Sequence, residues 1–275
     1  MSVVVPTHER PEALAICLQA LAAQKTPHEP QVIVVHDGPA SPATRAVAAA
    51  VTLLETERQC GPATARNLGV RNATGFFVLF TDDDCAPAGD WAAQLVQSLE
   101  RGARVVAGRT VSDNSTFARA TQAITDALMV PDPEGSLTFA PTMNLGCERD
   151  LLVEVPFDES FADAAGEDRA WCARVRERRI AIVPCESALV DHRPTLTGPG
   201  FVRQHLRYGR GARRLRASLD VPLGSPRLYT RILRTGFAAG PLVGALVIVA
   251  QAATAAGVAG QRLSEIRRSG ARPVP

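Results

Sequence analysis

The stretch FFVLFTDDDC at residues 76–85 is an apolar run followed directly by three carboxylates. Such a short run, rich in aromatic and branched residues, is typical of a buried strand. Side chains alternate along extended backbone, so we expect Asp82 and Asp84 on one side and Asp83 on the other. Converging carboxylates repel each other unless a cation lies between them, and oxygen ligands suit Mg²⁺ or Mn²⁺. The alternative interpretation is an acidic surface turn before a helix capped by Asp90.

Similar β-branched runs recur in the first half of the chain, with helical sequence between them. They lie at residues 3–5, 32–35, 51–54, 76–80 and 105–107. This alternation predicts an α/β fold with a mainly parallel sheet and helices on both faces. Ligands of such sheets bind beyond the carboxyl ends of the strands. Pro6, Thr7, Asp37 and the carboxylates at 82–84 are therefore expected at one edge.

Composition and charge restrict the kind of partner. The chain has 275 residues, 46% of them hydrophobic, and a net charge of +2, which excludes a disordered chain and does not indicate a general nucleic-acid binder. Six arginines lie between residues 203 and 216 with no acid among them. That segment predicts an anionic partner, either a diphosphate or a phospholipid surface, because no RNA-recognition or helix-turn-helix signature accompanies it.

Cysteine spacing and the N-terminal sequence indicate the compartment. The six cysteines include no Cys-x-x-Cys pair, so they are expected to be reduced thiols. Residues 2–5 already have the pattern of a first strand, and no charged leader precedes an apolar stretch. We therefore expect the catalytic part to be cytoplasmic.

The character of the chain changes near residue 200, which suggests a domain at 1–200 and a helical extension at 201–275. Residues 237–259 are apolar or small except for Gln251 and Thr254, and they are numerous enough to span a membrane. Arginines flank them on both sides, which opposes spanning under the positive-inside tendency. We expect this segment to lie on the cytoplasmic face of an anionic membrane. The alternative is a buried or oligomerising pair of helices.

A second acidic element opens a helical stretch at residues 169–179. Glu167 and Asp168 stand at its start, where acids complement the helix dipole in any case. Farther along, His192 follows a β-type run as a second contact for a cation or phosphate would. A lone histidine in such a place is more often structural.

Taken in order, these motifs resemble the family 2 glycosyltransferases, which have the GT-A fold. The similar segments lie at residues 3–10, 34–38, 61–67, 82–91, 144–149, 157–159 and 166–174. The chain departs from the family pattern at His36 and at Arg179, which replaces a common glycine. Residues 204–208 look like the Gln-x-x-Arg-Trp signature of processive members, with Tyr208 in place of tryptophan.

The resemblance implies an inverting, hexosyltransferase-type enzyme that uses a UDP-, GDP- or dTDP-linked sugar, Mn²⁺ or Mg²⁺, and a hydroxyl acceptor on a glycan, lipid or small molecule, as in the synthesis of cell-envelope glycans. Asp168 is the implied base, with Glu167 as its rival. The implied metal ligands are Asp84, Asp82 and His192. The implied donor-binding residues are Pro6, Thr7, Arg10, Asp37, Arg66, Asp82, Asp83 and Arg207.

Two other functions fit parts of the same pattern. A sugar nucleotidyltransferase also uses a doubly wound sheet and carboxylate-bound Mg²⁺, but it would carry an early Gly-rich loop, and residues 6–11 contain no glycine. A catalytically silent module that binds nucleotide sugars is the second alternative. The intact Asp82, Asp84 and Asp168 disfavour it.

Overall fold

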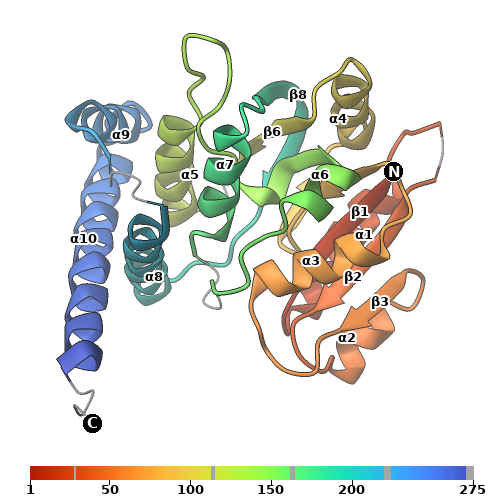
Figure 1. The fold of residues 1–275 in the computed structure, drawn as a ribbon, viewed down its shortest axis with the longest axis horizontal. Helices are drawn as coiled ribbons and strands as arrows, with labels where there is room; N and C mark the ends of the chain where they lie inside the picture. The colour runs from red at the N-terminus through yellow and green to blue at the C-terminus, as the bar shows by residue number, and fades with distance from the viewer. Residues whose placement is uncertain (28, 113–114, 162–164, 220–223, 271–275) are drawn as a thin grey trace. The chain divides into compact units, whose positions relative to one another are not determined.

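A computed structural model describes residues 1–27, 29–112, 115–161, 165–219 and 224–270. Their contacts divide into two compact units, which Figure 1 draws in one view. The first unit comprises Met1–Asp113, Met129–Ala162 and Glu167–Pro194. The second comprises Asn114–Leu128, Asp163–Gly166 and Thr195–Pro275. This division differs from the split expected at residue 200, because a helix from the middle of the chain packs with the C-terminal helices.

The first unit contains a mixed sheet of eight strands in the order β3-β2-β1-β4-β7-β6-β8-β5. The strands are β1 Ser2–Thr7, β2 Gln31–His36, β3 Thr52–Glu55, β4 Phe77–Phe80, β5 Cys85–Pro87, β6 Val105–Val111, β7 Leu145–Glu148 and β8 Ile182–His192. β1 pairs in parallel with β2 and β4, whereas β7 is antiparallel to β4 and β6. The predicted α/β fold is confirmed, and its sheet is mixed.

Helices cover both faces of this sheet, as the alternation predicted. They are α1 Pro11–Ala22, α2 Pro42–Val47, α3 Pro62–Asn72, α4 Trp91–Glu100, α6 Arg149–Glu154 and α7 Glu167–Glu177, with a 3₁₀ turn at Thr142–Asn144. Successive side chains of β1 pack on opposite faces of the sheet. Val4 packs in a core with α3, α6 and α7, and Val3 and Val5 pack in another with α1 and α4. α3 comes so close to β1 that a Cβ on Gly69 would lie 2.4 Å from Cγ1 of Val4.

The second unit is helical and consists of α5 Thr116–Leu128, α8 Gly198–Leu219, α9 Pro226–Ala238 and α10 Pro241–Gly270. α5 contributes alanines to a core that also contains Phe201 of α8, Ile232 of α9 and Val247 of α10. α8 and α10 pack closely at Gly209 and Gly257, where a Cβ would meet the backbone of the other helix. The predicted helical C-terminal region is confirmed.

The sequence suggested one apolar segment at residues 237–259. In the structure this stretch is divided between two helices. α9 ends at Ala238, and Gly240 then takes a φ of +131°, which favours glycine. α10 begins afresh at Pro241, whose missing N–H costs nothing at the first position of a helix. Pro241–Glu265 contains an 18-residue window with a mean hydropathy of 2.0 and is long and apolar enough to cross a membrane, as core helices of soluble proteins also are. The flanking Arg267 and Arg268 have side chains outside the described part.

Candidate active site

The three carboxylates lie in a turn and not on a continued strand. β4 ends at Phe80, and the backbone N–H of Cys85 donates to the carbonyl oxygen of Asp82 at 3.1 Å. The alternation expected for extended backbone therefore does not apply. Asp83 and Asp84 turn toward one arginine and Asp82 toward another. Asp82 and Asp84 therefore contact different arginines, and their convergence on one cation stays a prediction.

Arg10, just after β1, holds two of the carboxylates. Its guanidinium lies 2.9 Å from Oδ1 of Asp83 and 2.9 Å from Oδ2 of Asp84. The hydroxyl of Thr7 donates to Oδ2 of Asp83 at 2.7 Å. Burial raises the pKa of Asp83 to about 7, although Arg10 and Thr7 act in the opposite direction. The parallel pairing of β1 with β4 brings these residues together, as the predicted sheet edge requires.

Asp84 also faces a histidine that is distant in the sequence. Its Oδ1 lies 3.5 Å from Nε2 of His192, the last residue of β8. Burial alone would raise the pKa of Asp84, but His192 and Arg10 hold it below its ordinary value. The two residues therefore offer an ionised oxygen and an imidazole nitrogen side by side. This donor set suits Mn²⁺ or another borderline divalent cation.

The third carboxylate belongs to a buried ion-pair network. Arg66 of α3 is 3% exposed, and its guanidinium lies 3.0 Å from Oδ1 of Asp82 and 2.9 Å from Oε1 of Glu167. Burial alone would lower the pKa of Arg66, but Asp82 and Glu167 raise it above its ordinary value. Arg66 thus links the carboxylate turn to the start of α7. The two acidic elements found separately in the sequence lie at one place.

Asp168, next to Glu167, has a different environment. Its Oδ1 accepts a hydrogen bond from the backbone N–H of Arg169 at 2.7 Å, whereas Arg66 pairs with Glu167. Burial and the neighbouring Glu167 raise the pKa of Asp168 to about 7. A carboxylate with a pKa near neutrality can accept a proton readily at physiological pH. Asp168 thus has a raised pKa, and the neighbouring Glu167 is the acid that pairs with Arg66.

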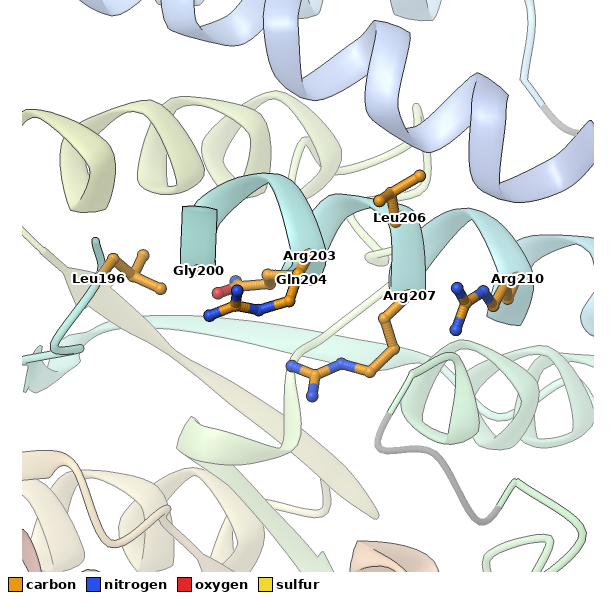
Figure 2. Close-up of a pocket in the computed structure, with 7 residues that line it drawn as sticks. All are labelled: Leu196, Gly200, Arg203, Gln204, Leu206, Arg207 and Arg210. Atoms are coloured by element: carbon orange, nitrogen blue, oxygen red, sulfur yellow. The ribbon is translucent and has the colours of Figure 1, made fainter. Parts of the chain in front are cut away.

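Other predicted site residues have mainly structural contacts. Asp37, at the end of β2, accepts hydrogen bonds from the backbone N–H groups of Cys60 at 2.7 Å and Gly61 at 2.9 Å. It thereby fixes the loop that leads into α3. Pro6 is buried within β1. Arg207 lies on α8 of the second unit and lines a pocket of about 390 Å³ with Arg203, Gln204 and Arg210, whose side chains point the same way in Figure 2.

The residues that could hold a metal differ from those predicted. Within the described part of the chain, Asp84, Cys85 and His192 form a group whose donor atoms lie within 4.8 Å of one another. Asp82 is outside that group and is paired with Arg66. No local sequence pattern indicates Cys85 as a ligand, because its proximity to His192 depends on the pairing of β5 with β8. Asp84 and His192 fit a divalent cation, and Asp82 is not supported as a direct ligand.

Removing the charge of Arg66 should test the network. Arg66→Ala leaves Glu167 buried without its cation, and breaking such a pair costs about 3–5 kcal/mol. We expect this loss in the free energy of unfolding measured by urea denaturation. Arg45 provides a matched control, since it also contacts a carboxylate, that of Glu55, but is exposed. Arg45→Ala should change stability little, and equal losses in both variants would contradict the proposed importance of the buried pair.

A family model and several known proteins match this chain in sequence. The model of the family described as glycosyl transferase family 2 matches residues 2–154. Glycosyltransferase AglE of Haloferax volcanii is 24% identical over 224 residues, which cover 77% of this chain and 72% of AglE. The pre-mycofactocin glycosyltransferase of Mycobacterium tuberculosis is 26% identical over 71% of this chain, but the match spans only 43% of that protein.

Solved structures share the fold. Mannosyltransferase PcManGT from Pyrobaculum calidifontis, in complex with GDP-Man and Mn²⁺, aligns with 98% of this chain and 79% of its own, with a TM-score of 0.62 and 19% identity. Staphylococcus aureus TarS 1–349 aligns over 98% of this chain and 91% of its own, with a TM-score of 0.57 and 19% identity. TarS 1–349 is also known in complex with UDP. At these identities the likeness concerns the fold.

Proposed function

Because the chain belongs to glycosyl transferase family 2, we propose that it transfers a sugar from a nucleotide-diphosphate donor to an acceptor hydroxyl with inversion at the anomeric carbon. The observation that carries this proposal is the ion-pair network of Arg66, which joins the carboxylate turn at Asp82 to the acids that open α7. Such a transfer needs a cation site near a base, and the network links the turn that carries Asp84 to the start of the helix that carries Asp168.

The donor-binding part of the proposal concerns the edge of the sheet around β1 and β4. Arg10 and Arg66 supply guanidinium groups there, which suit phosphate oxygens. Structures with the same fold contain GDP-Man or UDP, in line with a nucleotide-linked sugar. We assign Thr7, Asp37 and Asp83 to recognition of the nucleotide, because Thr7 and Asp83 lie beside Arg10 and Asp37 holds the loop that leads into α3.

The metal-binding part assigns Asp84 and His192 as the residues that hold Mn²⁺ or Mg²⁺. When bound, the cation supplies positive charge that stabilises the departing diphosphate. Arg10 contributes by orienting the Asp84 carboxylate through its contact with Oδ2, which leaves Oδ1 facing His192. Asp82 is assigned instead to holding Arg66.

The base is assigned to Asp168. In an inverting transfer the acceptor hydroxyl attacks the face of the sugar opposite the leaving group, and a carboxylate there takes the hydroxyl proton as the new bond forms. Asp168 has a raised pKa and does not share the contact between Arg66 and Glu167. Glu167, paired with Arg66, is assigned the role of positioning.

A donor panel tests this function. UDP-, GDP- and dTDP-sugars are added to the protein with and without Mn²⁺, and the midpoint of thermal unfolding is followed, since a ligand of the folded state raises it. We expect one nucleotide class to raise the midpoint, and to do so more with Mn²⁺. Free nucleotide diphosphate should then be released only when an acceptor is added. A chain that binds none of these donors would contradict the proposal.

We further infer that the second unit attaches the enzyme to the cytoplasmic face of an anionic membrane without crossing it. The second half of α10 packs along α8, where Arg213 lies 2.8 Å from Glu265. Charged groups are costly in the hydrocarbon core. Most of the exposed large apolar residues of α9 and α10 lie on α9 and the first half of α10, namely Tyr229, Leu233, Phe237, Leu242, Ile248 and Val249, whereas Leu263 lies in the second half of α10. Exposed Arg227, Arg231 and Arg234 on α9 complement an anionic surface.

Leu242→Gln combined with Ile248→Gln tests this attachment. These side chains are 63% and 50% exposed, so the change should leave the fold intact while weakening sedimentation with vesicles that contain phosphatidylserine. Salt should weaken binding of the parent protein as well, because each arginine near an anionic surface contributes about 1 kcal/mol. Phe76→Gln is the control, since Phe76 is 67% exposed on the first unit. Equal vesicle binding by all three proteins would refute the assignment.

A further inference from the structure

Cys85 directly follows the carboxylates and lies opposite His192. In the antiparallel pair of β5 and β8, Cys85 is the register partner of His192. The backbone N–H of Arg193 donates to the carbonyl oxygen of Asp84 at 2.8 Å, which extends the pairing by one residue. Directly opposed residues in such a pair project to the same face of the sheet. The thiol and the imidazole are therefore neighbours because of strand register.

The three donor atoms have the spacing of a coordination site. Oδ1 of Asp84 lies 3.5 Å from Nε2 of His192 and 3.9 Å from Sγ of Cys85. In a tetrahedral zinc site, bonds of about 2.0–2.3 Å place neighbouring donors roughly 3.3–3.6 Å apart. The third pair, Sγ of Cys85 and Nε2 of His192, lies within 4.8 Å, so side-chain adjustment would bring all three donors onto one ion. Three protein ligands with one open position are typical of catalytic zinc sites.

Burial and a neighbouring arginine define the surroundings of the group. Cys85 is 1% exposed, which places its sulfur on the protein side of the group. Arg10 contacts Oδ2 of Asp84, so the carboxylate is oriented with Oδ1 toward the sulfur and the imidazole. A soft thiolate selects for Zn²⁺ and Cd²⁺ over Mn²⁺ and Mg²⁺, which prefer oxygen.

We propose that Cys85 is a third ligand at the site of Asp84 and His192, and that it makes this site bind thiophilic divalent cations such as Zn²⁺ and Cd²⁺. The inference rests on the proposed function only for the assignment of a metal to Asp84 and His192. Binding replaces the thiol proton, which is released to solvent as the sulfur–metal bond forms. A thiophilic ion held in this way would exclude Mn²⁺ and inhibit transfer.

Cobalt titration of the full chain tests the proposal without any measurement of activity. Co²⁺ alone is added under reducing conditions, and the near-ultraviolet charge-transfer absorption of a cobalt–thiolate bond is recorded. The parent protein should show the band and Cys85→Ser should lack it. Cys185→Ser is the matched control, because Cys185 is also a buried free cysteine but lies beside Ser98 and Ser187. A band that survives in Cys85→Ser, or is lost in Cys185→Ser, overturns the assignment.

Affinities for single ions give a second measurement. Loss of even an outer partner of a metal ligand costs about 10–100-fold in affinity, so removing a direct ligand should weaken Cd²⁺ binding at least as much. Cys85→Ser should leave Mn²⁺ affinity much less affected, so that the ratio of the two affinities falls. An unchanged ratio contradicts a thiolate ligand even if Mn²⁺-dependent transfer is observed. A cobalt–thiolate band without any transfer would instead refute the proposed function alone.

Discussion

Asp168→Asn should lower turnover by about two to four orders of magnitude, the usual contribution of a general base, while donor affinity stays nearly intact. Asparagine has almost the same shape as aspartate but cannot accept the acceptor's proton. Asp168 has no part in the contact between Arg66 and Glu167, so the network around α3 and α7 should persist in the variant. Donor affinity with Mn²⁺ and single-turnover rates with saturating acceptor measure the two effects separately.

Glu167→Gln is the matched control for this prediction. Glu167 is 6% exposed and paired with Arg66 at 2.9 Å, so its neutralisation should lower stability and leave most of the turnover per folded enzyme. The opposite pattern, an active Asp168→Asn and an inactive Glu167→Gln, would exchange the roles of the two acids.

The raised pKa of Asp168 adds a pH dependence with a definite sign. With a pKa of about 7, the base is increasingly ionised as pH rises, so kcat/KM should climb through neutrality and then level off. Stability should move the other way. A carboxyl that holds its proton more tightly in the folded state contributes stability at low pH that is lost as pH rises through about 7. Asp168→Asn should therefore melt higher than the parent at pH 8, with a difference that shrinks toward acid.

The strands and the positions of the acidic motifs were predictable because they depend on local patterns. β1, β2 and β4 read directly as β-branched or aromatic runs. The contacts within the site were not predictable in the same way. Arg10 pairs with a carboxylate 74 residues away and Arg66 with one 101 residues away, and strand order and helix packing decide both pairings. Asp82 pairs with Arg66 and lies outside the candidate metal group of the described residues, where the chain turns after β4.

Two residues that depart from the family pattern have different environments in the structure. Arg179 stands where a glycine is common, and it takes a φ of +58°, a left-handed conformation that favours glycine. The glycine that is common at this position therefore indicates a left-handed backbone, and this chain keeps that backbone with an arginine. His36 is buried and accommodated by contacts with the backbone of Gly38 and Glu9. Histidine in place of an acid is therefore accommodated by local contacts, which no sequence pattern indicates.

Asp84→Ala should abolish the dependence of donor binding on metal. The variant removes the oxygen that faces His192 and Cys85, and the loss of a direct ligand should weaken Mn²⁺ binding by at least the 10–100-fold that outer partners contribute. The measurement is nucleotide-sugar affinity by calorimetry, with Mn²⁺ and with a chelator. The parent protein should bind more tightly with Mn²⁺, and the variant should bind equally weakly in both conditions.

Asp83→Asn separates this metal effect from a general disturbance of the turn. Asp83 contacts the same Arg10 and the hydroxyl of Thr7, yet it is outside the group of metal-ligand candidates within the described residues. Its change to asparagine should keep the response to Mn²⁺ even if it lowers affinity, because the asparagine oxygen can still accept from Thr7. The opposite result would be donor binding that still responds to Mn²⁺ in Asp84→Ala but no longer does so in Asp83→Asn. That result would assign the cation to Asp83 instead of Asp84.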